Sequence, residues 1–224
     1  MIELQNVTKY FRTTLGKKYI LKNSSFIIPE NVNVGILGKN GAGKSTLMRM
    51  LGKIEFPNEG RIISDKTFSW VMGVGGGFEK NMTGRANVKF VCRIYGKSQE
   101  EINRSIEFVK EFSELGDYFE MPIRTYSSGM KSRLTFGLSL AFDFDYLLID
   151  ETLSVGDARF RKKSKEALMK KIERCNVLLV SHDMGTLRDI CDVGIVSHNA
   201  KLHFFEDIND AIKMYSSINK TKGK

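Results

Sequence analysis

Proline is scarce in this sequence, and long apolar segments are absent from it. Only 3 of the 224 residues are proline and 20 are glycine, a usage that excludes a collagen-like chain and argues against a disordered one. No apolar run approaches the roughly 20 residues that a membrane-spanning helix requires, and the first residues lack the apolar core of a signal peptide. We therefore expect a soluble, cytoplasmic chain that folds as one large domain, although its length would allow two.

Cysteine is also rare. Cys92, Cys175 and Cys191 are odd in number and lack the close spacing of metal ligands, so neither a disulfide framework nor a zinc site is expected. The excess of 35 Lys and Arg over 26 Asp and Glu gives a formal net charge of +9. This charge is compatible with nucleic acid, an anionic membrane surface or an acidic partner, but it says nothing about the fold.

The densest basic segment covers residues 159–174. Its cations are interleaved with Phe160, Leu168 and Ile172, which share roughly one helical face. We interpret the segment as an amphipathic helix with a solvated basic face. Contact with a membrane surface or with nucleic acid is the alternative.

Short apolar segments alternate with helical ones along much of the chain. The segments at residues 32–37, 146–149, 176–180 and 193–196 each run into a turn and then a helical stretch, which predicts an α/β fold with a largely parallel sheet. Residues 2–28 instead predict several strands joined by a polar loop at residues 12–18, as an antiparallel edge.

The pattern changes between about residues 73 and 141. Ser98 and Glu101 have the spacing of a capping box at a helix start. Apolar residues then follow at helical spacing, namely Ile102, Ile106, Val109 and Phe112. A mostly helical insert is therefore predicted to interrupt the α/β domain.

The most informative motif satisfies G-x-x-x-x-G-K-[ST] directly after a predicted strand. Its glycines let the loop wind tightly, so that backbone N–H groups converge on phosphate oxygens, and the N-terminus of the following helix adds positive potential. In this motif Lys44 reaches the β- and γ-phosphates and Ser45 can ligate Mg²⁺. The residues predicted to bind a nucleotide are Gly38, Lys39, Asn40, Gly41, Ala42, Gly43, Lys44, Ser45 and Thr46.

Two further polar sites come directly after apolar strands. Asp150, at the carboxyl edge of the sheet, can hold Mg²⁺, and Glu151 can accept a proton from an attacking water. His182 follows another strand, so we expect it at the same edge, in contact with the γ-phosphate. His198 and His203 lack such a context and are interpreted as surface or packing residues.

Residues 126–130, Tyr-Ser-Ser-Gly-Met, precede another helical segment. Small residues at a helix start can form a second anion-binding N-terminus, although Ser-Ser-Gly is also an ordinary cap or turn. The position of this segment, between the phosphate loop and the acidic pair at residues 150–151, favours the functional interpretation.

Taken in order, these motifs and residues 154–157 (Ser-Val-Gly-Asp) resemble the ATP-binding cassette of ABC transporters across essentially the whole chain. Residues 83–85 (Thr-Gly-Arg), 126–130 and 155–157 resemble the branch that exports polysaccharides and teichoic acids. The segments that most resemble the ATP-binding subunit of capsular-polysaccharide exporters of Gram-negative bacteria are residues 87–91, 111–116 and 125–130.

The resemblance implies a P-loop NTPase fold with an antiparallel β edge. A RecA-like core would cover about residues 1–72 and 142–224, and a helical subdomain would cover about residues 73–141. The resemblance also extends to residues 8–11 (Thr-Lys-Tyr-Phe), where Phe11 occupies the place of the aromatic residue that stacks on adenine in the family. Tyr10 or Tyr19 could serve instead.

The resemblance also implies a site shared between two subunits. Ser127, Ser128 and Gly129 would belong to the signature segment, which in this family contacts the γ-phosphate of ATP bound to the opposite subunit. Asp157 would lie in the loop that crosses the dimer interface, and His182 would be the switch histidine.

The sequence departs from the family pattern at three places. The usual glutamine, a ligand of Mg²⁺ or water, is missing from residues 69–87, and Glu79 is the nearest candidate. The signature reads Tyr-Ser-Ser-Gly-Met where most cassettes have Leu-Ser-Gly-Gly-Gln. Residues 85–87 (Arg-Ala-Asn) lack the common glutamate. These features suit the polysaccharide branch better than nutrient importers.

These observations predict an ATPase that uses ATP and Mg²⁺, forms a homodimer and is peripheral to the cytoplasmic face of the bacterial inner membrane. It would power export of capsular polysaccharide through separate membrane-spanning permease subunits, which handle the cargo and dock on the helical insert. Another export substrate, such as teichoic acid, O-antigen or a drug, is an alternative. A cassette protein acting on nucleic acid or the ribosome is a further rival, but long coiled-coil insertions and a second cassette are absent from the sequence, so no nucleic acid is expected.

Overall fold

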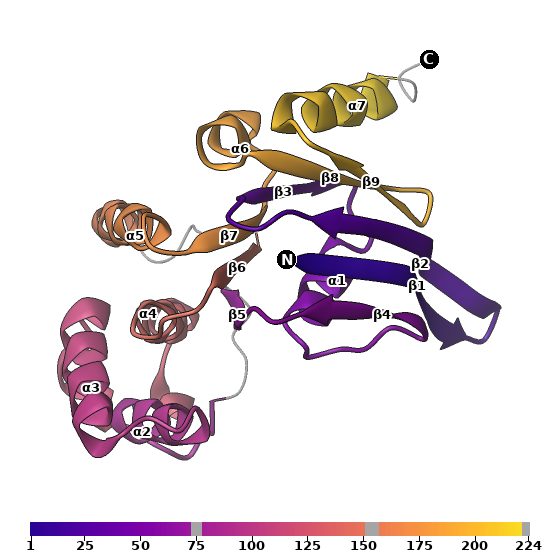
Figure 1. Ribbon diagram of the computed structural model, residues 1–224. Helices are drawn as coiled ribbons and strands as arrows, with labels where there is room; N and C mark the ends of the chain where they lie inside the picture. Colours follow the sequence, from indigo (N-terminus) through magenta and orange to yellow (C-terminus); the bar gives the residue numbers. More distant parts are fainter. Residues whose placement is uncertain (73–77, 151–156, 221–224) are drawn as a thin grey trace. The chain divides into compact units, whose positions relative to one another are not determined.

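Figure 1 shows the computed structural model of the chain, which describes residues 1–72, 78–150 and 157–220. The described residues form two compact units. The first contains residues 1–71, 144–150 and 175–220, and the second contains residues 72, 78–143 and 157–174. Within this part of the chain we find no helix that combines the length and the apolar character needed to cross a bilayer.

The first unit carries an antiparallel sheet in the order β2-β1-β4. Its strands are β1 (Ile2–Thr13), β2 (Gly16–Ile28) and β4 (Glu59–Ser64). β1 and β2 pair as far as Thr13 and Gly16, and the Thr13 hydroxyl donates to the Gly16 carbonyl at 2.8 Å. The polar loop predicted at residues 12–18 is therefore shorter than expected, because strand pairing overrides the polarity of these residues.

The second sheet has six strands in the order β5-β6-β7-β3-β8-β9. They are β3 (Val34–Gly38), β5 (Phe68–Met72), β6 (Tyr146–Asp150), β7 (Asn176–Val180), β8 (Val193–His198) and β9 (Lys201–Phe205). β3, β6, β7 and β8 run parallel, and β9 returns antiparallel to β8. The parallel strands are the four segments that the sequence predicted, so the α/β prediction is confirmed. The helical stretch predicted directly after residues 193–196 is wrong, because residues 201–205 pair with β8 as strand β9.

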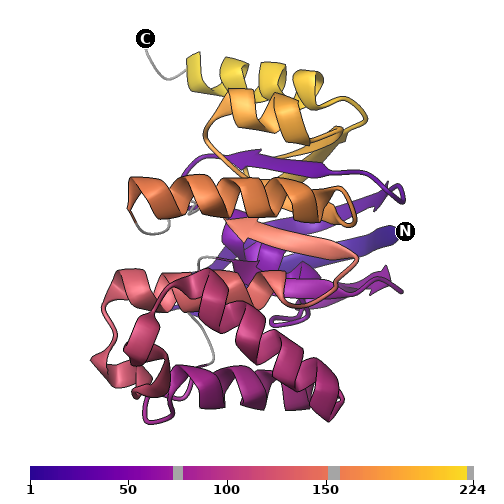
Figure 2. The ribbon, with the colours of Figure 1, turned by 90° about the vertical axis from the view of Figure 1, so that its left-hand side faces the viewer.

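Three helices complete the first unit, and an apolar core joins the first of them to both sheets. They are α1 (Lys44–Leu51), α6 (Met184–Ile190) and α7 (Ile208–Lys220). α6 and α7 lie side by side (Figures 1 and 2). One apolar cluster contains Ile2 of β1, Ile36 of β3 and Leu47 of α1, all without exposed surface. β3 is apolar throughout because a parallel strand is covered on both faces.

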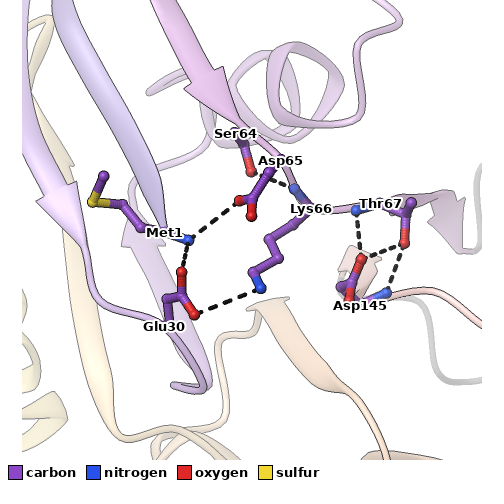
Figure 3. Close-up of polar contacts among 7 residues, drawn as sticks. All are labelled: Met1, Glu30, Ser64, Asp65, Lys66, Thr67 and Asp145. Atoms are coloured by element: carbon purple, nitrogen blue, oxygen red, sulfur yellow. Dashed lines mark hydrogen bonds and ion pairs between the residues drawn. The ribbon is translucent and has the colours of Figure 1, made fainter.

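Polar contacts fix the segment between β4 and β5 (Figure 3). Lys66 forms an ion pair with Glu30 at 3.6 Å, and Glu30 accepts a hydrogen bond from the amine of Met1 at 2.7 Å. Thr67 donates to the Asp145 carboxylate through its backbone N–H at 2.7 Å and its hydroxyl at 2.6 Å. These two bonds from Thr67 hold the pKa of Asp145 below its usual range. Because Asp145 directly precedes β6, the contacts hold the start of that strand.

The second unit is helical. It contains α2 (Gly84–Ile94), α3 (Gln99–Ser113), α4 (Ser128–Leu140), α5 (Ala158–Ile172) and short 3₁₀ helices at Gly116–Glu120 and Ile123–Thr125. The predicted capping box is present: the N–H of Glu101 donates to the Ser98 hydroxyl at 3.3 Å, and the N–H of Ser98 donates to the Glu101 carboxylate at 2.8 Å. The ring of Phe112 on α3 packs against Phe136 of α4 and Phe160 of α5.

α5 has the amphipathic character that the sequence predicted. Phe160 is buried, and two lysines bind acidic residues of the same unit. Lys163 lies 2.7 Å from the Glu114 carboxylate and Lys171 lies 2.6 Å from the Asp143 carboxylate. The cations exposed to solvent are Arg159, Arg161, Lys162, Lys165, Lys170 and Arg174.

Candidate functional site

The loop predicted to bind phosphate joins β3 to α1. It turns through a hydrogen bond from the N–H of Ala42 to the carbonyl of Lys39 at 3.0 Å. Gly43 is the N-cap of α1 and has a φ of +94°, which glycine adopts without strain. Because Gly43 has no side chain to cap the helix, the first N–H groups of α1 are available to an anion. A Cβ atom on Gly43 would collide with Ile20, so β2 packs directly on the loop.

Lys44, Ser45 and Asp150 lie together at the carboxyl edge of the parallel sheet. The ammonium of Lys44 donates to the carbonyls of Gly38 at 2.7 Å and Lys39 at 3.2 Å. The hydroxyl of Ser45 donates to the carboxylate of Asp150 at 2.8 Å. Asp150 ends β6, and the carboxyl ends of parallel strands meet at one edge. The structure thus brings a cation, a hydroxyl and a carboxylate together.

A cavity of about 420 Å³ opens beside the loop. Its lining includes phosphate-loop residues and, from the β1–β2 hairpin, Phe11, Lys18 and Ile20. Phe11 is 40% exposed. Tyr10 and Tyr19 instead pack against each other, with ring centroids 5.5 Å apart. Since neighbouring residues of a strand face opposite sides, the structure favours Phe11 over the two tyrosines as the aromatic wall of this cavity.

The ends of β6 and β7 lie next to each other. Asp150 pairs in register with Val180, the last residue of β7. His182 follows two residues later and is exposed. Asp183 is the N-cap of α6, where its carboxylate accepts a backbone N–H at 3.0 Å. Glu151 lies outside the described residues, so its assignment as the base stays a prediction.

Ser197 is a loop-supporting residue that sequence reasoning missed. Its hydroxyl donates to the carbonyl of Ala42, and the side chain is buried at the end of β8. Gly38 lies opposite Ser197 in the sheet, and a Cβ atom on Gly38 would lie 2.8 Å from the Ser197 carbonyl oxygen. A serine directly after an apolar strand was the only signal, and the sequence did not reveal that β8 lies beside β3.

The predicted signature segment begins α4 in the second unit. Ser127 is the N-cap, and its hydroxyl accepts the N–H of Met130 at 3.2 Å. Ser128 and Gly129 are the first two residues of the helix. Apart from the backbone of the helix itself, the described residue nearest to a Cβ atom on Gly129 would be Ser127, whose hydroxyl lies 3.9 Å away. The start of α4 therefore has open space beside its backbone.

Asp157 is held in place at the start of α5. Its carboxylate accepts the N–H of Phe160 at 2.9 Å and a guanidinium N–H of Arg133 at 2.6 Å. The Phe160 N–H, together with the charge of Arg133, keeps the pKa of Asp157 below its usual range. Residues 154–156 of the same predicted loop lie outside the described residues. Arg133 belongs to α4, so Asp157 is tied to the helix that begins with the signature segment.

Glu79, the candidate for the missing glutamine, also belongs to the second unit. Its carboxylate accepts the N–H of Asn81 at 3.2 Å. The buried amide of Asn87 accepts the Glu79 N–H at 2.8 Å and donates to the Glu79 carbonyl at 3.1 Å. The same amide donates to the carbonyls of Met82 at 3.3 Å and Thr83 at 3.0 Å. Asn87 thus fixes the loop before α2.

Two motifs of the polysaccharide branch touch each other in the second unit. A Cβ atom on Gly84 would lie 2.5 Å from the hydroxyl oxygen of Tyr126. That hydroxyl donates to the carbonyl of Tyr118 at 2.6 Å. Thr83, the N-cap of α2, accepts the N–H of Ala86 at 3.1 Å. Because Gly84 has no side chain, the hydroxyl of Tyr126 can lie beside it. Tyr126 directly precedes Ser127, the N-cap of α4.

Comparison with known proteins identifies the family to which this fold and loop belong. A family model described as ABC transporter matches residues 21–154. The chain belongs to the ABC transporter family. The resemblance to this family that the motifs indicated is therefore confirmed.

Two relatives in the ABC transporter family align along nearly their whole length. The polysialic acid transport ATP-binding protein KpsT of Escherichia coli is 49% identical over 222 residues, which cover 97% of this chain and 99% of KpsT. The capsule polysaccharide export ATP-binding protein CtrD of Neisseria meningitidis serogroup B is 40% identical over 218 residues, which cover 97% of this chain and 100% of CtrD. The similarity to the capsular branch is also confirmed.

A solved structure shares the fold. The dimeric ATP-binding cassette MJ0796 in a post-hydrolysis state, bound to ADP and Pi, superposes with a TM-score of 0.77 at 22% identity. The superposition covers 93% of this chain and 99% of that chain. The predicted fold class, an ABC transporter cassette of the P-loop NTPase type, is therefore confirmed.

Proposed function

We propose that this chain is the ATP-hydrolysing subunit of an ABC exporter for capsular polysaccharide. The observation that carries the ATPase part of this proposal is the hydrogen bond between Ser45 and Asp150 beside the ammonium of Lys44. A cation, a hydroxyl and a carboxylate at the start of a helix, next to a cavity with an aromatic wall, suit a nucleoside triphosphate with a divalent cation.

ATP binds with its phosphates on the loop and its adenine on Phe11. Backbone N–H groups of residues 40–46 and the N-terminus of α1 meet the phosphate oxygens. Lys44 contacts the β- and γ-phosphates. Its present bonds to the carbonyls of Gly38 and Lys39 keep the ammonium within the loop until phosphate oxygens replace these acceptors.

Ser45 and Asp150 would hold Mg²⁺. Both offer the oxygen ligands that Mg²⁺ prefers, and their hydrogen bond of 2.8 Å places the two oxygens close enough to serve one ion. When bound, Mg²⁺ neutralises charge on the β- and γ-phosphates. Glu79 stays the nearest candidate in the sequence for the missing family glutamine.

Hydrolysis needs a base for the attacking water and positive charge around the γ-phosphate. Glu151, the neighbour of Asp150, accepts the proton from the water. The water oxygen bonds to the γ-phosphorus, the bond to the β–γ bridging oxygen breaks, and ADP and phosphate are released. His182 contacts the γ-phosphate, and Lys44 stabilises the charge that develops on its oxygens.

The second half of each site comes from another copy of the chain. The sequence has one phosphate loop and one signature segment, so a complete site requires a homodimer. Ser127 caps α4, and Ser128 and Gly129 are its first residues. Backbone N–H groups at this helix start, beside open space, bind the γ-phosphate held by the partner's loop. The bond from Arg133 to Asp157 links the signature helix to the segment that crosses between subunits.

The names of two relatives support the proposed cargo and partners. KpsT is named for polysialic acid transport and CtrD for capsule polysaccharide export. We infer that the chain is peripheral to the cytoplasmic face of the bacterial inner membrane and acts with separate permease subunits, which handle the polysaccharide and dock on the helical second unit. Nucleic acid is not among the partners we propose.

Mixing two inactive variants tests the shared ATPase site. Gly129→Asp places a negative charge beside the γ-phosphate in trans, while Lys44→Ala removes the cation in cis. Each variant alone should hydrolyse ATP at a small fraction of the wild-type rate. In a mixture, heterodimers keep one intact loop opposite one intact signature segment. Phosphate release should therefore rise above the rate of either variant alone.

Two controls make this experiment decisive. Asn103→Asp adds the same charge at an exposed position of α3, where the carboxylate can still accept the hydrogen bond from Gln99. This variant should hydrolyse ATP like the wild type. Gly129→Asp should still bind ATP as a monomer, because binding uses its own loop. If Gly129→Asp abolished nucleotide binding by the monomer, the site would not be shared and the mechanism would be wrong.

The cargo is tested separately in an encapsulated strain that lacks the gene. The wild-type chain should restore surface polysaccharide, and Lys44→Ala should not. Normal surface polysaccharide in the deletion strain would refute the proposed cargo without affecting the ATPase assignment.

A further inference from the structure

The β1–β2 hairpin forms a fixed wall of the nucleotide cavity. Ile20 packs against Gly43 of the phosphate loop. The N–H of Lys22 donates to the carbonyl of Ala200, in the turn between β8 and β9, at 2.7 Å. Further along β2, the ring of Phe26 stacks on the ring of Phe204 in β9, and their centroids lie 5.6 Å apart. The hairpin therefore has a set position relative to the loop.

Two adjacent lysines of the hairpin occupy opposite faces. Lys18 pairs with Phe11 across the two strands, and both line the cavity. The ammonium of Lys17 lies 4.2 Å from the ring centroid of Tyr10 on the other face. Lys18 is exposed, and within the described residues its ammonium forms no ion pair or hydrogen bond. Its ammonium is thus available to a ligand in the cavity.

We propose that Lys18 binds the α-phosphate of the nucleotide, an inference that rests on the proposed ATP-binding function. Phe11 and Lys44 fix the two ends of the ligand, with the base on the hairpin and the β- and γ-phosphates on the loop. The α-phosphate is the phosphate nearest the nucleoside. It therefore lies on the hairpin side of the loop, where Lys18 lines the cavity.

This contact has a defined kinetic signature. ATP and ADP both carry the α-phosphate, and the bond that breaks is two phosphates away from it. Lys18 would therefore bind the ground state and the transition state equally, which lowers KM without raising kcat. Lys44 differs in this respect, because it contacts the phosphate that is transferred.

Lys18→Met keeps the aliphatic stem and removes the ammonium. In the full-length chain we expect the Kd values of ATP and ADP to rise together by about 5- to 30-fold, the range for a charge-assisted hydrogen bond in a partly solvated cleft. KM should rise by a similar factor, and kcat should stay within about twofold of the wild type. Lys18→Arg should restore most of the affinity. Competition with a fluorescent ATP analogue and a phosphate-release assay measure these values.

Lys17→Met is the matched control, because it removes the same charge from the opposite face and should leave both Kd values unchanged. An equal loss in Lys17→Met would mean that overall charge is responsible, and unchanged affinity in Lys18→Met would overturn the inference directly. A loss for ATP but not ADP would place Lys18 at the γ-phosphate and overturn it as well. If Lys44→Ala bound ATP like the wild type, the proposed function itself would fail, an outcome distinct from failure of Lys18 alone.

Discussion

The contact between Gly84 and Tyr126 gives the sharpest quantitative prediction. In Gly84→Ala the new Cβ atom would lie 2.5 Å from the Tyr126 hydroxyl and 3.0 Å from the carbonyl oxygen of Phe119. Tyr126 is only 5% exposed, so its ring has little room to withdraw. The clash should break the hydrogen bond from Tyr126 to the carbonyl of Tyr118.

The magnitude follows from three terms. Loss of the buried hydrogen bond costs about 1 kcal/mol, and overpacking adds about 1–3 kcal/mol. Alanine returns at most about 1 kcal/mol of helix propensity, and less at Gly84 because this is the first residue of α2. We expect Gly84→Ala to lower the free energy of unfolding by roughly 2 kcal/mol.

A double-mutant cycle tests whether the hydroxyl is the cause. Tyr126→Phe should cost about 1 kcal/mol, but it removes the atom nearest to the new methyl group. The contact of the methyl group with the carbonyl oxygen of Phe119 remains in the double variant. The double variant should therefore lose about 1 kcal/mol less than the sum of the two single variants, which is the coupling energy. Urea unfolding followed by circular dichroism measures each value. Gly129→Ala is the control, because its Cβ atom would enter open space. Additive losses in the double variant would refute the reasoning.

Two further predictions concern the loop and the cap around α2 and α3. Asn87→Ala should lower the free energy of unfolding by roughly 2–3 kcal/mol, because the buried amide satisfies the N–H and carbonyl of Glu79 and two more carbonyls; a loss below about 0.5 kcal/mol in urea unfolding would contradict this. The backbone N–H of Ser98 and the ammonium of Lys97 lower the pKa of Glu101 to about 2. The stabilising effect of the Glu101 carboxylate should therefore be complete above about pH 4.5 and be lost as the pH falls toward 2. In thermal unfolding at a series of pH values, the stability difference between the wild type and Glu101→Gln should shrink over this range.

Local patterns predicted much of the fold. The four parallel strands were readable because each is an apolar segment that a turn follows, and α3 was readable because Ser98 and Glu101 cap a helical apolar stripe. The length of the β1–β2 hairpin was not readable, since its end residues are polar and become strand only through pairing across the turn. The phosphate loop was predictable because its chemistry is contained in one continuous segment.

The contacts that support the site were less accessible. Ser197, Ile20 and Lys18 meet the phosphate loop only because β8 and the β1–β2 hairpin lie beside it, and no local pattern states which strands are neighbours. The same holds for Gly84 and Tyr126. Each belongs to a motif that was recognised in the sequence, but the two residues come into contact only in the folded second unit. Glu151 remains a prediction from its place after β6.

The phosphate loop is braced on both sides. Ser197 bonds to its Ala42 carbonyl from β8, and Ile20 packs on Gly43 from β2. A loop that is ordered before its ligand arrives loses little conformational entropy on binding, and so more of the interaction energy with each phosphate appears as affinity. The heat released when nucleotide binds should then report phosphate contacts rather than folding of the loop.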